Sequence, residues 1–247
     1  MDPRETLSAI AAPTGDIGAS FYFDPATVAA GREIGLDGFK FYILGRGGAL
    51  GDVPAAVVTS AFGYFEPNLI QAQWDKARAI VDPATAAQAY FDECGRRGSE
   101  RFADLDGLDA YVDAADEVIA HADLAGRPLF AGISTLRCAT DDPAACAAQK
   151  AAVLRELRGS AHLVAVLASG LTDAQAHSIK RPDDVALFGW SEPPSLPSDA
   201  DERMASAEEV TDTMLVGAFA TLDDVRADAL ISGTRSMHAR LGDGASG

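Results

Sequence analysis

The chain has 247 residues, 48% of them hydrophobic, and a formal net charge of −17. This composition predicts a sizeable core and excludes global disorder, and the acidic surface opposes binding to nucleic acids and anionic lipids. The three cysteines lack the spacing of a disulfide framework or a zinc site. No signal peptide or membrane-length apolar run is recognisable, so we expect a cytoplasmic protein.

Acidic residues followed by proline mark four predicted helix starts along the chain. The acidic side chain accepts an otherwise unpaired N–H of the first turn, and proline at the first helical position lacks one. Glycine is expected to end three helices, at Gly35, Gly159 and Gly170. The predicted helices cover residues 25–34, 53–65, 67–80, 83–95, 108–122, 143–158, 161–168, 173–179, 182–188 and a long pair between about 201 and 240.

Strand signals are sparse, and residues 40–44 form at most a short strand without a partner. The predicted fold class is therefore all-α, as a multi-helix orthogonal bundle. Residues 191–200 contain three prolines, a composition typical of a linker. We expect a helical body with a ligand pocket over residues 1–190. The remaining residues, 191–247, are expected to supply C-terminal helices that pack back on this body.

The clearest chemical feature lies in residues 154–168. Arg155, Glu156 and Arg158 share one turn, and His162 is the one polar residue of the apolar run that follows. A helix that is apolar all round lies inside a protein, so His162 is expected in the core. An imidazole near a carboxylate and guanidinium groups suits acid–base chemistry, which makes His162, Glu156 and Arg158 candidate catalytic residues. A core histidine bonded to a backbone carbonyl, with surface arginines nearby, is the alternative.

Two features in the first third of the chain indicate ligand binding. Four glycines surround Arg46 in residues 41–51, which predicts a flexible loop whose N–H groups bind an anion beside Arg46. Aromatic residues also gather in this third, and we expect some of them to form an apolar wall. The candidate ligand-binding residues are Arg46, Arg155, Phe41, Tyr42 and Tyr64. A plain turn and a plain aromatic core are the alternatives.

The helix predicted over residues 108–122 carries a stripe of carboxylate and histidine side chains that could suggest a metal site. Asp113, Glu117 and His121 recur every four residues and so share one helical face. Metal sites in helical proteins usually take ligands from more than one helix, so we interpret this stripe as a solvated face. No metal site and no cofactor are predicted.

Five short phrases, taken in order, resemble one family: residues 46–51, 126–129, 154–162, 188–191 and 211–212. The chain resembles the SalK-like helix-turn-helix family of actinobacteria, whose members are mostly uncharacterised. Leu157 and Ser160 stand where the family phrase has histidine and aspartate. The resemblance implies a winged-helix element toward the C-terminus. Here only the proline-rich, acidic residues 192–210 occupy that place, which implies a truncated or degenerate winged-helix part.

Two functions follow from these patterns. The first is a small-molecule-binding helical protein of actinobacterial specialised metabolism, whose catalytic form would be a cofactor-independent cyclase, isomerase or lyase. The alternative is a transcription-regulator-like or protein-interaction module without DNA-reading elements. Residues 183–230 hold twelve acidic and two basic residues, hence a net charge of −10, which opposes DNA binding. The expected partner is an apolar or anionic small molecule, with no nucleic acid and no membrane, and a homodimer is left open.

Overall fold

The computed structural model describes residues 1–242, and within them the chain is all-α, as predicted. This part of the chain contains no β-strand and no helix long and apolar enough to cross a bilayer. Two short 3-10 turns, Gly48–Leu50 and Pro182–Asp184, accompany the α-helices. The helices are α1 (Pro3–Ala19), α2 (Pro25–Glu33), α3 (Gly38–Gly47), α4 (Ala55–Phe62), α5 (Pro67–Arg78), α6 (Pro83–Phe102), α7 (Leu108–His121), α8 (Pro128–Ile133), α9 (Pro143–Ala168), α10 (Asp173–Lys180), α11 (Ala200–Phe219) and α12 (Asp224–Gly242).

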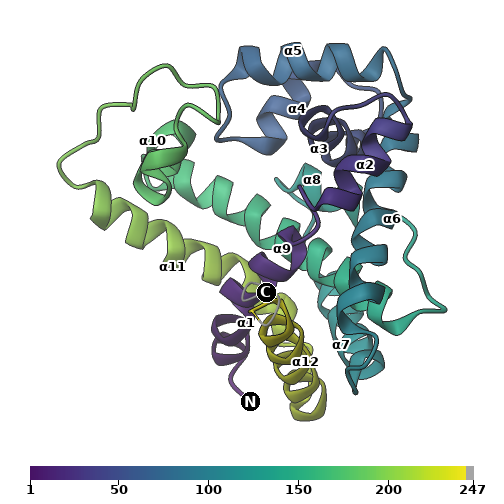
Figure 1. Cartoon of the computed structure of the whole chain (residues 1–247). Helices are drawn as coiled ribbons and strands as arrows, with labels where there is room; N and C mark the ends of the chain where they lie inside the picture. The colour runs from purple at the N-terminus through teal and green to yellow at the C-terminus, as the bar shows by residue number, and fades with distance from the viewer. Residues whose placement is uncertain (243–247) are drawn as a thin grey trace.

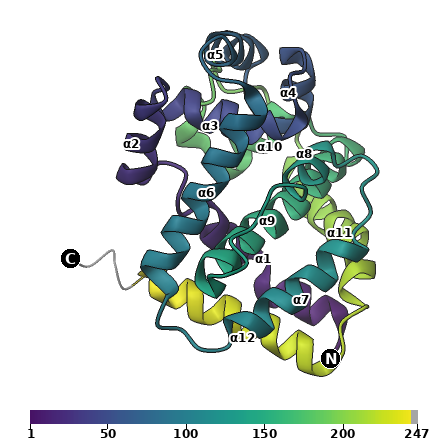
Figure 2. The same ribbon diagram turned by 90° about the vertical axis from the view of Figure 1, so that its right-hand side faces the viewer.

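The central helix, α9, is longer than the sequence predicted. It runs without a break past Gly159, where we expected an end. A glycine inside a helix costs about 1 kcal/mol relative to alanine, and the contacts of α9 with α1, α6, α7 and α11 outweigh that cost. Figure 1 shows α9 crossing the middle of the molecule, and Figure 2 shows α6 and α11 on its two sides.

Small residues let two helices approach the first half of α9 closely. A Cβ atom on Gly18 of α1 would lie 2.9 Å from the carbonyl oxygen of Ala151. One on Gly98 of α6 would lie 2.5 Å from the carbonyl oxygen of Ala144. The alanine-rich half of α9 is therefore a tight crossing point, and its charged half extends beyond it.

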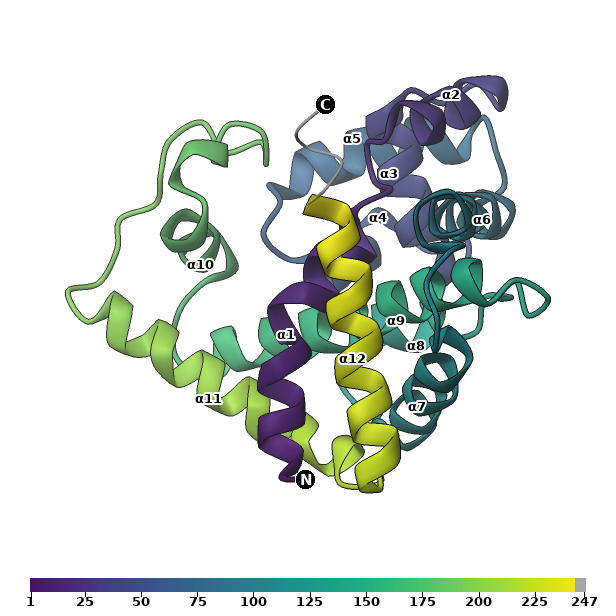
Figure 3. The ribbon, with the colours of Figure 1, turned by 60° about the horizontal axis from the view of Figure 1, so that its bottom comes forward.

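The C-terminal helices contact the N-terminal helix and several central helices. Helix α12 contacts α7 and α1, and α11 contacts α9 and α1. Figure 3 shows α1 and α12 side by side. In the connection between α10 and α11, residues 191–199 form neither helix nor strand. Residues 192–210 therefore form no β-hairpin, and their second half is the start of α11.

The predicted helix starts are confirmed at all four acidic–proline pairs. Each acidic side chain accepts a backbone N–H of the first turn at 2.9 to 3.2 Å: Asp24, Glu66, Asp82 and Asp142. The end predicted at Gly35 is also confirmed, with a φ of 85° at that glycine. The helix predicted over residues 182–188 is wrong, because only the 3-10 turn Pro182–Asp184 forms there. Helices α1, α3 and α8 were not predicted.

The glycine-rich stretch around Arg46 is a helix, so the predicted flexible loop is wrong. Helix α3 covers it as far as Gly47 and continues into the 3-10 turn. A Cβ atom on Gly45 would lie 2.4 Å from the Cβ of Tyr90, so this glycine permits close contact with α6. Helical N–H groups donate within the helix, and Arg46 carries its charge into the interior of the fold.

Candidate functional site

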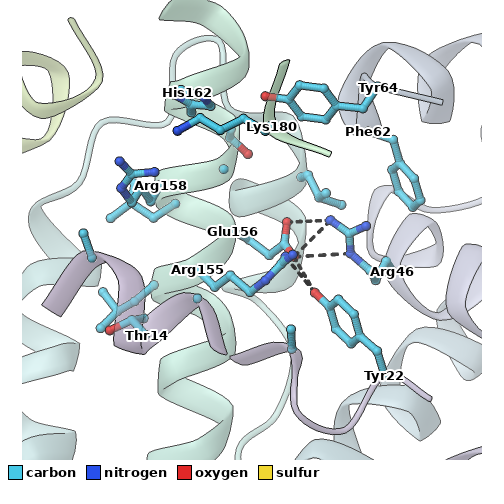
Figure 4. A pocket seen from close by; sticks show the side chains of 18 of the residues that line it. Thr14, Tyr22, Arg46, Phe62, Tyr64, Arg155, Glu156, Arg158, His162 and Lys180 are labelled. Carbon is cyan, nitrogen blue, oxygen red and sulfur yellow. Dashed lines mark hydrogen bonds and ion pairs between the residues drawn. The ribbon is translucent and has the colours of Figure 1, made fainter. Parts of the chain in front are cut away.

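An open pocket of about 1330 Å³ lies beside the second half of α9. Helices α1, α3, α4, α10 and α11 contribute to its wall, and its aromatic side includes Phe39, Tyr42, Phe62, Tyr64 and Phe65. Six cationic and three acidic side chains line it. The wall therefore carries a net positive charge in a chain whose own net charge is −17. Figure 4 shows part of this pocket from close by.

One face of α9 presents its polar groups to the pocket. Arg155, Arg158, Gly159 and His162 all line it. Their spacing of i, i+3, i+4 and i+7 places them on one side of a helix that continues past the glycine. We call these four residues the α9 stripe. The uninterrupted helix is what aligns them.

A buried group of charges, the Glu156 cluster, consists of Tyr22, Arg46, Arg155 and Glu156. Arg46 Nη2 donates to the two carboxylate oxygens of Glu156 at 3.0 and 2.9 Å, and its Nε donates to one of them at 3.2 Å. Arg155 and the Tyr22 hydroxyl also donate to this carboxylate, at 2.7 and 3.0 Å. Burial alone would raise the pKa of Glu156, but the charges of Arg46 and Arg155 hold it below its usual range. Two cations therefore surround one carboxylate (Figure 4).

Aromatic groups fix the buried guanidinium of Arg46. Its central carbon lies 4.6 Å from the ring centroid of Phe62 and 5.1 Å from that of Tyr42. Its Nη1 also donates to the Tyr42 hydroxyl. Burial raises the pKa of Tyr22 far above its ordinary value, so this phenol remains a hydrogen-bond donor. Arg46 is thus held in place by protein partners.

A second group, the Glu208 cluster, consists of Arg158, His162, Lys180, Glu208 and Thr211. Glu208 of α11 accepts from Arg158 Nη2 at 2.7 Å and from Lys180 Nζ at 2.6 Å. The Glu208 side chain is 33% exposed and that of Lys180 is 53% exposed. Burial would raise the pKa of Glu208, but the hydrogen bonds from Lys180 and Arg158 lower it to about 2.

The hydrogen bonds of His162 define its tautomer. Its Nδ1 lies 3.0 Å from Thr211 Oγ1, which in turn lies 2.7 Å from the carbonyl oxygen of Ala207. A carbonyl oxygen only accepts, so the one hydroxyl proton goes to Ala207, and the hydroxyl oxygen accepts from Nδ1–H. The neutral ring therefore keeps Nε2 as an acceptor. Burial lowers the pKa of His162, which favours this neutral form.

The structure brings seven of the eight predicted site residues to one pocket: Arg46, Arg155, Glu156, Arg158, His162, Tyr42 and Tyr64. His162 lies on the pocket wall with its side chain 14% exposed, not within the core as expected. The apolar run around it is not buried all round, since Leu167 is 56% exposed. Phe41 lies outside the pocket lining and packs edge-on against Tyr90, with ring centroids 4.8 Å apart.

Sequence reasoning missed Glu208, Thr211 and Lys180. The first two are three residues apart on α11 and therefore share a face. The local sequence does not show which helix this face contacts, because Arg158 and Glu208 are 50 residues apart in the chain. Asp113, Glu117 and His121 do not form a group that could hold a metal ion, and no group of three such ligands is found elsewhere in residues 1–242.

The comparisons with known proteins identify a family. Residues 8–193 match a helix-turn-helix family, which is most of the chain and includes the whole α9 stripe. The chain belongs to this helix-turn-helix family. No curated protein and no solved structure matches it. Within the family match, a four-residue turn joins α9 and α10 and contains Gly170 at a φ of 79°. This order is typical of a helix-turn-helix motif.

The second helix of this pair, α10, buries one of its faces. Four side chains of α10 are buried: Ala174, Ala176, His177 and Ser178. The His177 ring lies 3.8 Å from that of Phe188. A recognition helix has to expose its side chains to reach base edges in the major groove. In this family member the α10 residues Ala176, His177 and Lys180 form part of the pocket wall.

Proposed function

We propose that this helix-turn-helix family protein binds a small molecule with an apolar, ring-containing body in the pocket beside α9. The pocket itself carries this proposal, because it joins an aromatic wall to a few convergent polar groups, as ligand sites do. Several lining residues hold buried polar atoms without a hydrogen-bond partner: Thr14, Arg97, Arg158, Ser160 and His177. Each such atom costs about 1 to 3 kcal/mol when left unpaired. A bound molecule would pair some of them.

We extend the proposal to proton transfer at His162. Its Nε2 is an acceptor beside the pocket, and its Nδ1 is anchored by Thr211, an arrangement that suits a general base. Arg158, one turn earlier on the same stripe, would stabilise a developing negative charge. Glu156 is held by three donors and would position Arg46 and Arg155. A cofactor-independent cyclase, isomerase or lyase would need groups of this kind.

The source of the protein, its cellular compartment and the apolar character of its ligand are also proposals. The short phrases shared with SalK-like proteins support an actinobacterial source and a role in specialised metabolism, and the lack of disulfide spacing supports the cytoplasm. The apolar rim of the pocket supports a largely apolar ligand, since Phe23 and Leu187 line it and are 56% and 65% exposed.

A regulator-like module is the second candidate, and the helix-turn-helix family match favours it. In that role the protein would retain the family body and act through a protein partner. The buried face of α10 and the net charge of −10 over residues 183–230 oppose DNA contact. A pocket that holds an effector is compatible with either candidate.

The experiment is a fluorescence titration with a neutral aromatic probe, N-phenyl-1-naphthylamine. We expect saturable binding of one probe per chain. Gly15 of α1 lines the pocket, and a Cβ atom there would meet nothing within 4 Å, so Gly15→Leu places a side chain in the open space. This variant should weaken probe binding by about tenfold or more, because it fills the volume that the probe occupies.

Gly217→Leu is the matched control, since Gly217 is an exposed helical glycine outside the pocket with the same open surroundings. It should leave the affinity unchanged. Unsaturable binding, or equal affinity in both variants, would contradict the proposed function. A specific complex with DNA in gel shifts at moderate salt would favour the regulator instead.

A further inference from the structure

We propose that the ligand is an acid, and that its acidic group binds on the α9 stripe between Arg155 and Arg158, over Gly159. This inference rests on the proposed function, because it names the chemical class of the molecule that the pocket would bind. The apolar body of the acid would extend from the stripe along the aromatic wall (Figure 4). Three independent observations support this placement.

The first observation is the excess of cations within each cluster. Arg46 and Arg155 share the carboxylate of Glu156, and Arg158 and Lys180 share that of Glu208. The Arg155 side chain is 28% exposed, and one of its terminal nitrogens makes both of its side-chain hydrogen bonds. A positive charge without a counter-charge is costly in a partly buried site. An anion beside Arg155 would compensate it through charge-assisted hydrogen bonds.

The second observation is the open space above Gly159. The residue lies inside a continuous helix, so its backbone does not require glycine. A Cβ atom there would meet no atom within 4 Å, unlike the glycines at the tight α9 crossings. Gly159 sits between Arg155 and His162 on the stripe and therefore leaves a gap where a side chain would stand. A small acidic group fits such a gap and would lie against the helix backbone.

The third observation is the set of unpaired donors on residues that line the same pocket. The Nε atom of Arg158 is buried and has no hydrogen-bond partner. The hydroxyl groups of Ser160 on α9 and Thr14 on α1 are also buried without partners, in side chains whose residues are 6% and 4% exposed. Guanidinium and hydroxyl groups all donate hydrogen bonds, and a carboxylate accepts several at once. An acid is therefore the ligand class that satisfies this wall.

The experiment compares two probes that differ in a single acidic group. 1-Anilinonaphthalene-8-sulfonate carries a sulfonate, and N-phenyl-1-naphthylamine has the same ring system without it. The folded protein should bind the sulfonate probe about tenfold more tightly, as one charge-assisted contact implies. Arg155→Met and Arg158→Met should each remove most of that advantage, because each should weaken binding of the sulfonate probe more than binding of the neutral probe.

Arg226→Met is the matched control, because it removes one arginine from an exposed site outside the pocket. It should preserve the preference for the sulfonate. The inference is overturned if wild-type protein binds both probes equally, or if the two pocket variants weaken them to the same extent. Should Arg155→Met fail to fold by circular dichroism, Arg158→Met decides alone. Failure of the neutral probe to bind at all would instead overturn the proposed function.

Discussion

The Glu156 and Glu208 clusters share the same chemistry and differ in their surroundings. In each, one carboxylate lies between two cations, and α9 supplies one or more of the members. The Glu156 side chain is 4% exposed, and its two cationic partners come from α3 and α9. The Glu208 side chain is 33% exposed, and one of its partners, Lys180, is half in solvent. Burial is therefore the variable that separates them.

Burial changes the free-energy cost of losing one partner of such an ion pair. In a buried site, an unpaired charge has no solvent to stabilise it, so the partners are fixed and any loss is costly. At the half-exposed site, water and salt replace a missing partner at little cost. The partners in the Glu156 cluster are accordingly fixed, and they position Arg155. The partners in the Glu208 cluster, which includes His162, can exchange with water and salt.

The largest expected effect comes from Glu156→Gln. This change leaves Arg46 and Arg155 without a counter-charge in the interior, and we expect a loss of about 3 to 5 kcal/mol in the free energy of unfolding. Urea unfolding followed by circular dichroism measures it. The double variant Arg46→Met, Glu156→Met replaces the central pair with apolar groups and should lose less than Glu156→Gln alone. If the double variant loses more unfolding free energy than Glu156→Gln, the Arg46–Glu156 ion pair itself stabilises the fold. The loss in Glu156→Gln would then not come from leaving buried cations without a counter-charge.

The local sequence was enough to predict much of the fold. Acidic side chains followed by proline predicted the starts of four helices because their mechanism is local. Helix α3 was missed because glycines that permit close contact with other helices, such as Gly45 against Tyr90, produce the same pattern as a loop. The end predicted at Gly159 was wrong because long-range contacts along α9 outweigh the cost of one glycine.

The residues of the candidate site also fall into those that the local sequence predicts and those that only the tertiary structure brings together. The residues of the α9 stripe that the sequence singled out are close in the chain, and helical spacing places them together. Arg46 was named for its glycine neighbours, and its true partner, Glu156, lies 110 residues away. Glu208 carries no local signal, and Thr211 stands only within a phrase of the family resemblance, because the crossing of α9 and α11 is what brings both to His162. Pairs of this kind require the tertiary structure.

A smaller effect is expected from the same substitution in the exposed cluster. Glu208→Gln should cost about 1 kcal/mol at pH 7, the scale of solvent-screened ion pairs. The pKa of Glu208 falls from 4.5 to about 2 in the folded chain. Its stabilisation is therefore complete above pH 4.5 and is lost as the pH falls toward 2. The stability difference between wild type and variant should shrink over that range. A loss as large as that of Glu156→Gln would erase the distinction between the clusters.

The smallest effect concerns His162, which reports on the exposed cluster. Burial lowers its pKa, Glu208 and Asp212 raise it, and Arg158 and Lys180 lower it. Removal of the Glu208 charge leaves the two cations unopposed, so Glu208→Gln should lower the pKa of His162 further, and Asp212→Asn should do so less. Nitrogen NMR across a pH titration measures this and should also show Nδ1 protonated in the neutral ring. A pKa that rises would mean that the Glu208 charge does not act on His162 in the folded chain. A proton on Nε2 of the neutral ring would mean that this nitrogen is not an acceptor, and it would remove the basis for proton transfer at this site.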